Sequence, residues 1–186
     1  MSERVPTVTM VCTGNICRSP AMHYLAQQEW GDAATVTSAG IHAEIGMDVP
    51  SPMRTAAERH GLHVPRHRPT QLDRAILERA DLVLVATQQH ATWARQEWGG
   101  DGPAHLFGIK EAAELSKRAH APHGESPRER LLHAADALHT ERLERPVALR
   151  SLDDPWSRDQ ATFNRVMDEI VADLAAISDW AGLRRH

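Results

Sequence analysis

Short apolar runs alternate with amphipathic segments along the first 107 residues. Four of these runs are rich in β-branched and other apolar residues and predict strands at residues 5–12, 35–39, 81–86 and 104–107. The segments between them predict helices at 19–30, 52–60, 71–79 and 91–98. Strands that alternate with helices form parallel units with right-handed crossovers. We therefore predict a three-layer α/β fold, in which a twisted four-stranded parallel sheet is flanked by helices.

The C-terminal third of the chain follows a different pattern. Apolar residues recur at helical spacing from Phe163 to Ile177 and predict a last helix that packs on the sheet. Residues 109–150 are rich in Ala, Arg, His and Glu, contain several prolines and have no strand-like run. We interpret 109–150 as an inserted helical or lid segment within a single domain of residues 1–186. One amphipathic helix is expected around 131–138, and disorder around 119–127.

Composition excludes several classes of protein. A net charge of −4 argues against a general nucleic-acid binder, which would carry a basic surface. No apolar run approaches the ~20 residues that cross a bilayer, and the first residues lack the layout of a secretory signal. The two cysteines lie in one short loop, so no disulfide framework is expected. We expect a cytoplasmic protein without nucleic-acid or membrane partners; the sequence does not indicate its oligomeric state.

The loop after the first strand, Cys12-Thr-Gly-Asn-Ile-Cys-Arg-Ser-Pro20, contains the candidate chemistry. Ser19 followed by Pro20 predicts a helix N-cap with proline at the first helical position. A loop that enters a helix directs several N–H groups to one point, where the helix adds partial positive charge and anions bind. Arg18 can hold two oxygens of a phosphate group. The expected phosphate-binding residues are Thr13, Gly14, Asn15, Ile16, Cys17 and Arg18.

Cys12 is the candidate nucleophile of this loop. The same positive groups favour its thiolate, which can attack phosphorus and form a covalent phosphocysteine. The Ser19 hydroxyl is expected to donate a hydrogen bond to the sulfur and improve it as a leaving group. The alternative, a buried cysteine in a capped turn, explains less of the spacing of Gly14, Arg18 and Pro20. A Walker nucleotide site is not supported, because Gly-Lys-Ser/Thr is absent.

These residues resemble the low-molecular-weight protein tyrosine phosphatase family, whose active-site loop is Cys-x5-Arg-Ser/Thr near the N-terminus. A second motif, Asp154-Pro155-Trp156, resembles the family's Asp-Pro-Tyr segment. The resemblance implies an enzyme that hydrolyses phosphate monoesters, above all protein phosphotyrosine, without a metal or cofactor. It implies that Asp154 protonates the leaving oxygen and then activates water. The proline after Asp154 favours it over Asp153.

The resemblance also implies residues that support the loop. The family's hydrogen-bond network would consist here of Asn15, Ser19, Ser38 and His67. For His67 the alternative is an exposed side chain in a basic segment. Cys17 corresponds to the family's second cysteine and is the expected redox partner, forming a reversible disulfide with Cys12. The alternative is a small buried residue that fills space.

Departures from the family leave the substrate open. Ala43 and Glu44 stand where the family has an aromatic pocket wall, and Trp156 replaces the tyrosine of the opposite wall. Ile16 favours an aromatic substrate, because relatives that act on phosphoarginine carry Thr there. The alternatives are a small-molecule phosphatase, a non-catalytic phosphate-recognition module, and an arsenate reductase, which would need cysteines after Cys17. The histidines of 120–139 lack companion ligands at metal-site spacing, so no metal is expected.

Overall fold

The computed structural model describes residues 4–184, and the ends of the expected domain, 1–3 and 185–186, lie outside the described residues. Four parallel strands form one sheet in the order β2-β1-β3-β4. The predicted strands and the parallel sheet are confirmed. The strands are β1 (Thr7–Cys12), β2 (Thr35–Gly40), β3 (Leu82–Val85) and β4 (Leu106–Gly108).

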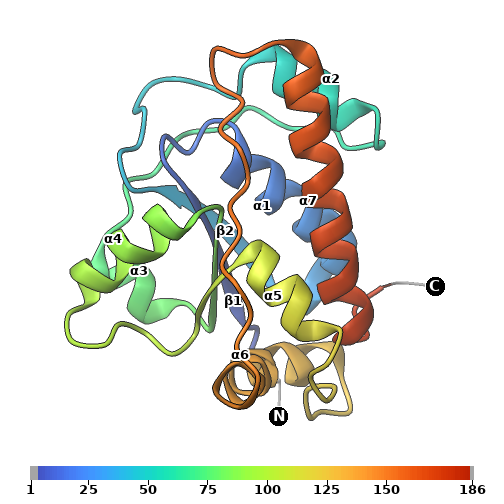
Figure 1. Cartoon of the computed structure of the whole chain (residues 1–186). Helices are drawn as coiled ribbons and strands as arrows, with labels where there is room; N and C mark the ends of the chain where they lie inside the picture. Colours follow the sequence, from blue (N-terminus) through green and yellow to red (C-terminus); the bar gives the residue numbers. More distant parts are fainter. Residues whose placement is uncertain (1–3, 185–186) are drawn as a thin grey trace.

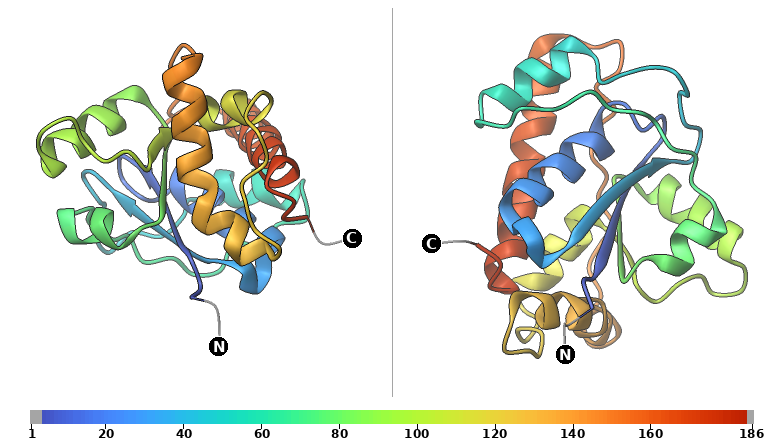
Figure 2. Two further views of the ribbon diagram at one scale, coloured as in Figure 1. Left: turned by 90° about the horizontal axis from the view of Figure 1, so that it is seen from below. Right: turned by 180° about the vertical axis from the view of Figure 1, so that it is seen from behind.

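Helices cover both faces of this sheet (Figures 1 and 2). One face carries α1, α5 and α7, with α2 packed against α7, and the other face carries α3 and α4. The helices are α1 (Arg18–Trp30), α2 (Ser51–Glu58), α3 (Arg74–Arg79), α4 (Gln88–Trp98), α5 (Ile109–Ser116), α6 (Pro127–Glu144) and α7 (Gln160–Trp180), with a 3₁₀ turn, η1 (Gly31–Ala33).

The two central strands are buried on both faces because their side chains alternate between two cores. In β1, Val8 and Met10 contribute to the larger cluster on the α1 and α7 side, whereas Val11 contributes to the smaller cluster beside α3 and α4. In β3, Leu84 and Val85 divide in the same way. Covered on both faces, the sheet presents its loops at the carboxyl ends of the strands, where ligands bind in such folds.

The first residues of α1, α3 and α4 differ from the sequence prediction; α4 begins at Gln88, three residues before the expected start. Ser19 is not the N-cap of α1; Cys17 takes that position without a side-chain cap, because the Ser19 hydroxyl is bonded elsewhere in the loop. The predicted helix at 71–79 begins only at Arg74, where the Asp73 side chain accepts a hydrogen bond from the N–H of Ile76. Gln71 instead pairs with Gly40 through an isolated bridge.

The segment 109–150 contains α5 and α6 but does not form a lid. In Figure 1, α6 lies at the end of the sheet where the strands begin, opposite the loop that follows Cys12. Arg128 of α6 donates to the carbonyl of Asp32 in η1 at 3.0 Å. The chain then returns along the sheet, and the N–H of Leu152 donates to the carbonyl of Ala86 at 2.9 Å.

The expected disorder around 119–127 is not observed, because two side chains hold this loop in place. Trp180 Nε1 donates to the carbonyls of Ala119 and His120 at 3.1 and 2.9 Å. Arg130 donates to the carbonyl of Glu125 at 3.2 Å. The expected amphipathic helix around 131–138 is confirmed as part of α6, with Leu131 and Leu138 buried. Among the described residues, no helix has both the length and the apolar character needed to cross a membrane.

Candidate active site

The loop between β1 and α1 is shaped by its contact with the chain that leaves β2. The N–H groups of Ile41, His42 and Glu44 donate to the carbonyls of Cys12, Thr13 and Gly14 at 3.0, 2.9 and 2.9 Å. In a trans peptide the carbonyl and the next N–H point in opposite directions. The N–H groups that follow these three carbonyls are therefore turned away from 41–44, as an anion-binding loop requires.

Gly40 makes this close approach possible. A Cβ atom at this position would lie 2.4 Å from the carbonyl oxygen of Thr13 and 2.9 Å from the backbone nitrogen of Asn15. Both neighbours are backbone atoms, so no side chain could move aside to make room. Glycine is consequently required here, because the end of β2 directly touches the candidate phosphate loop, residues 12–19.

Asn15 fixes the centre of the loop from inside the protein. Its backbone has φ of 56°, a left-handed conformation that asparagine tolerates better than most residues. The side chain is fully buried and satisfied: Oδ1 accepts from His67 Nε2 at 3.1 Å and from the N–H of Thr70 at 2.9 Å. Its Nδ2 donates to Ser19 Oγ at 2.8 Å. Asn15 therefore holds an unfavourable turn in place through its side chain.

Ser19 contacts the candidate nucleophile. Its Oγ lies 2.9 Å from Cys12 Sγ, and both residues are buried. Because Asn15 Nδ2 can only donate to the Ser19 oxygen, the Ser19 proton remains available for the sulfur. A hydroxyl in this position can donate a hydrogen bond to a sulfur that bears negative charge. The geometry supports the contact between Ser19 and Cys12 expected from the sequence.

The expected four-residue network is formed in part. Asn15, Ser19 and His67 are connected as predicted, but Ser38 is not joined to them; its Oγ lies 3.0 Å from His23 Nδ1. His67 finds its second partner in the hydroxyl of Tyr24, 2.8 Å from Nδ1. Burial lowers the pKa of His67, and burial together with His67 lowers the pKa of His23 to about 4. Both rings are thus neutral supports behind the loop near pH 7.

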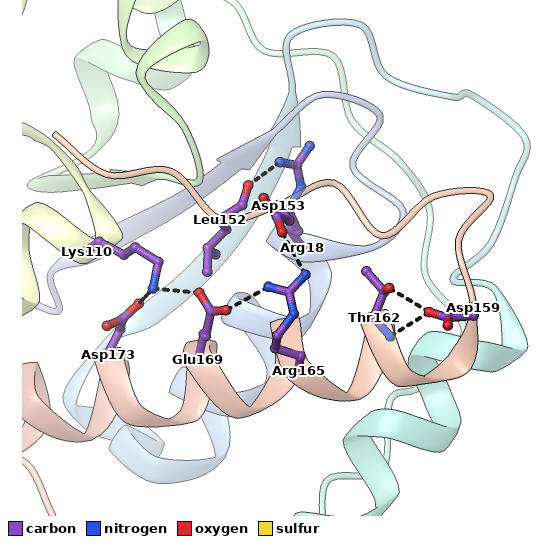
Figure 3. A network of polar contacts seen from close by, with 9 residues as sticks. All are labelled: Arg18, Lys110, Leu152, Asp153, Asp159, Thr162, Arg165, Glu169 and Asp173. Carbon is purple, nitrogen blue, oxygen red and sulfur yellow. Dashed lines mark hydrogen bonds and ion pairs between the residues drawn. The ribbon is translucent and has the colours of Figure 1, made fainter.

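Arg18 connects the loop to the segment before α7. The residue is buried, and Nη1 donates to the carbonyl of Leu152 at 3.0 Å (Figure 3). Its Nη2 lies 3.5 Å from Asp154 Oδ2 and 3.5 Å from Thr13 Oγ1. A guanidinium anchored at one nitrogen in this way presents the rest of its planar fork to the pocket.

The structure separates the two neighbouring aspartates. Asp154 faces Arg18 and lines the pocket that also contains Cys12. Asp153 points away and pairs with Arg165 of α7 at 2.7 Å (Figure 3). Arg165 in turn pairs with Glu169, so Asp153 belongs to a surface network along α7. Of the two aspartates, Asp154 is therefore the one that lies beside Cys12 and Arg18 in the pocket.

The pocket is lined by residues from three segments of the chain. Of the predicted wall residues, Glu44 and Trp156 line it, but Ala43 does not. The side chain of Asn15 is used inside the protein instead of facing the pocket, which leaves only its backbone to bind a ligand. The lining residues are Cys12, Thr13, Gly14, Ile16, Cys17, Arg18, Glu44, Asp154 and Trp156.

Cys17 differs from Cys12 in its surroundings. Both cysteines are free and buried. Burial, together with the nearby Cys12 and Asp154, raises the pKa of the Cys17 thiol to about 12. This shift favours the protonated thiol at neutral pH. A thiol of such high pKa reacts slowly with an oxidised partner, and its role as redox partner stays a prediction.

The sequence reasoning missed His90, which is buried beside the loop and bonded to Thr13. The available signal was its position three residues after Thr87, the spacing of a helix capping box, which the structure shows at the start of α4.

The insertion histidines line a separate cavity of about 350 Å³ beside α6. Across residues 4–184, no three His, Cys, Asp or Glu side chains are arranged to hold a metal ion. The histidines of that cavity are His120, His123 and His133.

Comparison with known proteins identifies relatives of this chain. A family model described as low molecular weight phosphotyrosine protein phosphatase matches residues 7–125. The match includes the loop at 12–19 and α5 but ends before α6 and Asp154, so this family model does not test the place of Asp154. Of the segment expected as an insertion, residues 126–150 lie beyond the matched part.

Individual relatives agree with the family match. The low molecular weight protein-tyrosine-phosphatase Ptp of Acinetobacter johnsonii is 36% identical over 91 residues, 49% of this chain and 63% of that protein. Protein-tyrosine phosphatase A of Mycobacterium bovis is 28% identical over 183 residues, 95% of this chain and 92% of that protein. An arsenate reductase of Bacillus licheniformis is 33% identical over 115 residues, 56% of this chain and 79% of that protein. This chain therefore spans less than two thirds of the Acinetobacter relative.

Solved structures show the same fold. The YwlE arginine phosphatase from Geobacillus stearothermophilus superposes with a TM-score of 0.69 at 18% identity, covering 94% of this chain and 91% of that one. At this level of identity the likeness concerns the arrangement of strands and helices.

Proposed function

Since this chain belongs to the low molecular weight phosphotyrosine protein phosphatase family, we propose that it hydrolyses phosphate monoesters through a phosphocysteine intermediate. Protein phosphotyrosine is the favoured substrate. One observation carries the proposal: Asp154, from the far end of the sequence, lines the same pocket as Cys12 and pairs with Arg18. A nucleophile, a cation and an acid–base group thus converge on one small site.

In the first step, the Cys12 thiolate attacks phosphorus and the bond from phosphorus to the ester oxygen breaks. The electron pair stays on the leaving oxygen, which takes the proton of the Asp154 carboxyl group. Arg18 and the loop N–H groups stabilise the charge on the remaining phosphoryl oxygens. In the second step, the Asp154 carboxylate takes a proton from water, which attacks phosphorus and releases phosphate. The Cys12 thiolate is restored, with the Ser19 hydroxyl donating to it.

The shape of the pocket supports an aromatic ester. Ile16 and Trp156 provide apolar surface on the lining, and Trp156 lies next to Asp154, where the leaving group must be protonated. A second candidate, a small phosphate ester, is favoured by a different observation. Glu44 lines the pocket in place of an apolar wall, and a carboxylate there could accept a hydrogen bond from a polar leaving group.

Two other hypotheses receive less support. Arsenate reduction coupled to thiol exchange needs cysteines that follow Cys17, and the sequence contains none. A non-catalytic phosphate-recognition module would not need Asp154 beside Arg18. We place the protein in the cytoplasm, where thiols such as the free Cys12 and Cys17 stay reduced.

Hydrolysis of p-nitrophenyl phosphate in the presence of EDTA tests the reaction. We expect turnover by the purified protein and only the background rate for Cys12→Ser, because the hydroxyl of serine is a far weaker nucleophile than a thiolate. An unchanged rate in Cys12→Ser would contradict the mechanism. Tight binding of phosphopeptides without turnover would favour the recognition module. Turnover of phosphotyrosine peptides, phosphoarginine and small phosphate esters, measured side by side, then ranks the substrates.

A further inference from the structure

His90 joins the start of α4 to the phosphate loop. The residue is 1% exposed and belongs to the first turn of α4. Its Nδ1 lies 3.1 Å from the backbone nitrogen and 3.0 Å from the Oγ1 of Thr87. On the other side of the ring, Nε2 lies 2.8 Å from Thr13 Oγ1. His90 does not line the pocket itself, so any effect on a bound group passes through Thr13.

The backbone of Thr87 decides which ring nitrogen of His90 carries the proton. A backbone N–H can only donate, so Nδ1 of His90 must accept the hydrogen bond from Thr87. In a neutral ring the proton then resides on Nε2, which donates to Thr13 Oγ1. The ring is neutral because burial, together with the charge of Arg18, lowers the pKa of His90 to about 3.

The hydroxyl of Thr13 is thereby oriented. Its oxygen accepts from His90 Nε2 and lies within 3.5 Å of the donor Nη2 of Arg18. These two donors occupy the acceptor side of the oxygen, which leaves the hydroxyl proton for a third partner. Thr13 lines the pocket next to Cys12. The partner available to that proton is therefore a group bound in the pocket.

We propose that His90 is a positioning residue that turns the Thr13 hydroxyl proton into the pocket, where it donates a hydrogen bond to a phosphoryl oxygen. The inference rests on the proposed phosphatase function, and it adds a side-chain donor to the N–H groups of the loop. The same pair of contacts keeps Arg18 Nη2 beside the loop. Phosphate recognition at this site therefore depends on a residue of α4 that no ligand touches.

A purely structural role for His90 makes a different prediction. As a member of the capping box with Thr87, the ring could simply stabilise the start of α4. Replacement would then lower the melting temperature and leave the affinity for phosphate unchanged. The positioning role instead requires that His90 and Thr13 act together on phosphate.

The test is a double-mutant cycle on Thr13→Val and His90→Leu, with inhibition by inorganic phosphate, kcat/KM for p-nitrophenyl phosphate and melting temperature as readouts. Thr13→Val should weaken phosphate inhibition and kcat/KM about 10- to 100-fold, the usual loss for a hydrogen bond to a charged group. His90→Leu should lower both several-fold, and the double variant should be no worse than Thr13→Val alone. Thr13→Ser and His90→Gln, which keep the hydroxyl and an N–H donor, should recover most of the loss.

The outcomes separate this inference from the proposed function. Full turnover with unchanged phosphate inhibition in Thr13→Val would overturn the inference and leave the phosphatase intact. Additive losses in the double variant would also overturn it, because independent residues do not share one contact. If His90→Leu does not fold, Thr13→Val against Thr13→Ser and His90→Gln still decides the question. If the unaltered protein binds phosphate without turnover, the phosphatase proposal fails and phosphate affinity alone still tests the inference.

Discussion

The phosphate loop at 12–19 and the acid segment at 152–156 meet at one pocket but are held in opposite ways. In the loop, Asn15 and Ser19 are fully buried and hydrogen-bonded, and Arg18 is 4% exposed. In the acid segment, the side chain of Asp154 is 55% exposed and Trp156 is 47% exposed. The proposed anion site is thus built into the core, whereas the proposed acid is carried on the surface.

This difference assigns separate duties to the two regions. A rigid loop keeps its donors in place before the substrate arrives, so little reorganisation accompanies the development of charge. The acid segment is fastened at its base, where Leu152 accepts from Arg18 and Asp153 pairs with Arg165 (Figure 3). Beyond that base the Asp154 side chain is 55% exposed; it lies 3.5 Å from Arg18 and accepts a hydrogen bond from the N–H of Trp156 at 3.1 Å. The loop should therefore determine whether phosphate binds, and the acid segment how fast the ester is cleaved.

Replacing the acid gives the largest expected effect on this division. Asp154→Asn should lower kcat for an ester with a poor leaving group by about 10²- to 10⁴-fold, the usual contribution of acid–base catalysis. KM and inhibition by phosphate should change little, since the loop is untouched. The matched control is Asp153→Asn, which removes an exposed ion pair worth at most about 1 kcal/mol. Equal losses in both variants would contradict the assignment of Asp154.

A substitution that displaces the loop should, in contrast, weaken the binding of phosphate. Gly40→Ala places a methyl group 2.4 Å from the Thr13 carbonyl, so the loop must shift. Overpacking of this kind costs about 1–3 kcal/mol of stability, and phosphate inhibition should weaken together with kcat/KM. Gly108→Ala is the control, because its added methyl group lies at an ordinary contact distance, 3.6 Å from Glu111, and should leave phosphate inhibition unchanged. A Gly40→Ala variant with normal phosphate affinity would show that the loop does not depend on this contact.

The neutral histidines behind the loop predict a pH dependence of stability. The folded pKa of His23 is about 4, below its usual value, so between these values the unfolded chain binds a proton that the folded chain does not. The contribution of neutral His23 to the free energy of unfolding is complete above pH ~6.5 and is lost as the pH falls toward the folded pKa. Between pH 7 and pH 5, the free energy of unfolding should therefore fall by about 1–2 kcal/mol because of His23. In urea unfolding at pH 7 and pH 5, His23→Gln should lose less unfolding free energy than the unaltered chain. Equal losses in the two proteins would contradict the role of His23.

The smallest effect is expected at the exposed wall of the pocket. Trp156→Ala should raise KM for an aryl phosphate several-fold while kcat stays within a factor of ~3, because a half-exposed ring adds about 1 kcal/mol of contact. Trp156→Phe, which keeps an aromatic face, should restore KM. A steady-state comparison with a small aliphatic phosphate, whose KM should not change, isolates the contribution of the ring. A large loss of kcat would place Trp156 in the chemistry itself.

The sequence predicted the part of the site whose residues are contiguous. Strand β1, the loop with Cys12 and Arg18, and the bond from Ser19 to Cys12 all follow from one short stretch of chain. Of the distant partners, the family resemblance supplied His67 for Asn15 and Asp154 for the pocket, whereas two others were missed. Tyr24 on His67 and His90 on Thr13 join residues far apart in the sequence, and no spacing rule connects them.

The long segment before the acid shows the same limit. Its apolar spacing predicted part of α6 but not α5. Its position in the chain suggested a lid, whereas α6 lies at the other end of the sheet. Although α6 lies close to Asp154 in sequence, it is far from Asp154 in the fold, because residues 145–153 cross the length of the molecule between them. The place of α6 depends on its packing against α5 and η1, which local patterns do not encode.

Trapping of the covalent intermediate decides whether Cys12 is the nucleophile. Asp154→Asn is mixed with p-nitrophenyl phosphate and quenched in acid within the first turnovers, and the peptides are examined by mass spectrometry. Phosphorylation of Cys12 should remain fast, because the loop is intact and p-nitrophenolate leaves without being protonated. Hydrolysis of phosphocysteine should be slow, because asparagine cannot act as a base at this position, and the intermediate should therefore accumulate. We expect one phosphoryl group on Cys12 and none on Cys17. Turnover without a phosphorylated Cys12, or phosphate on another residue, would contradict it.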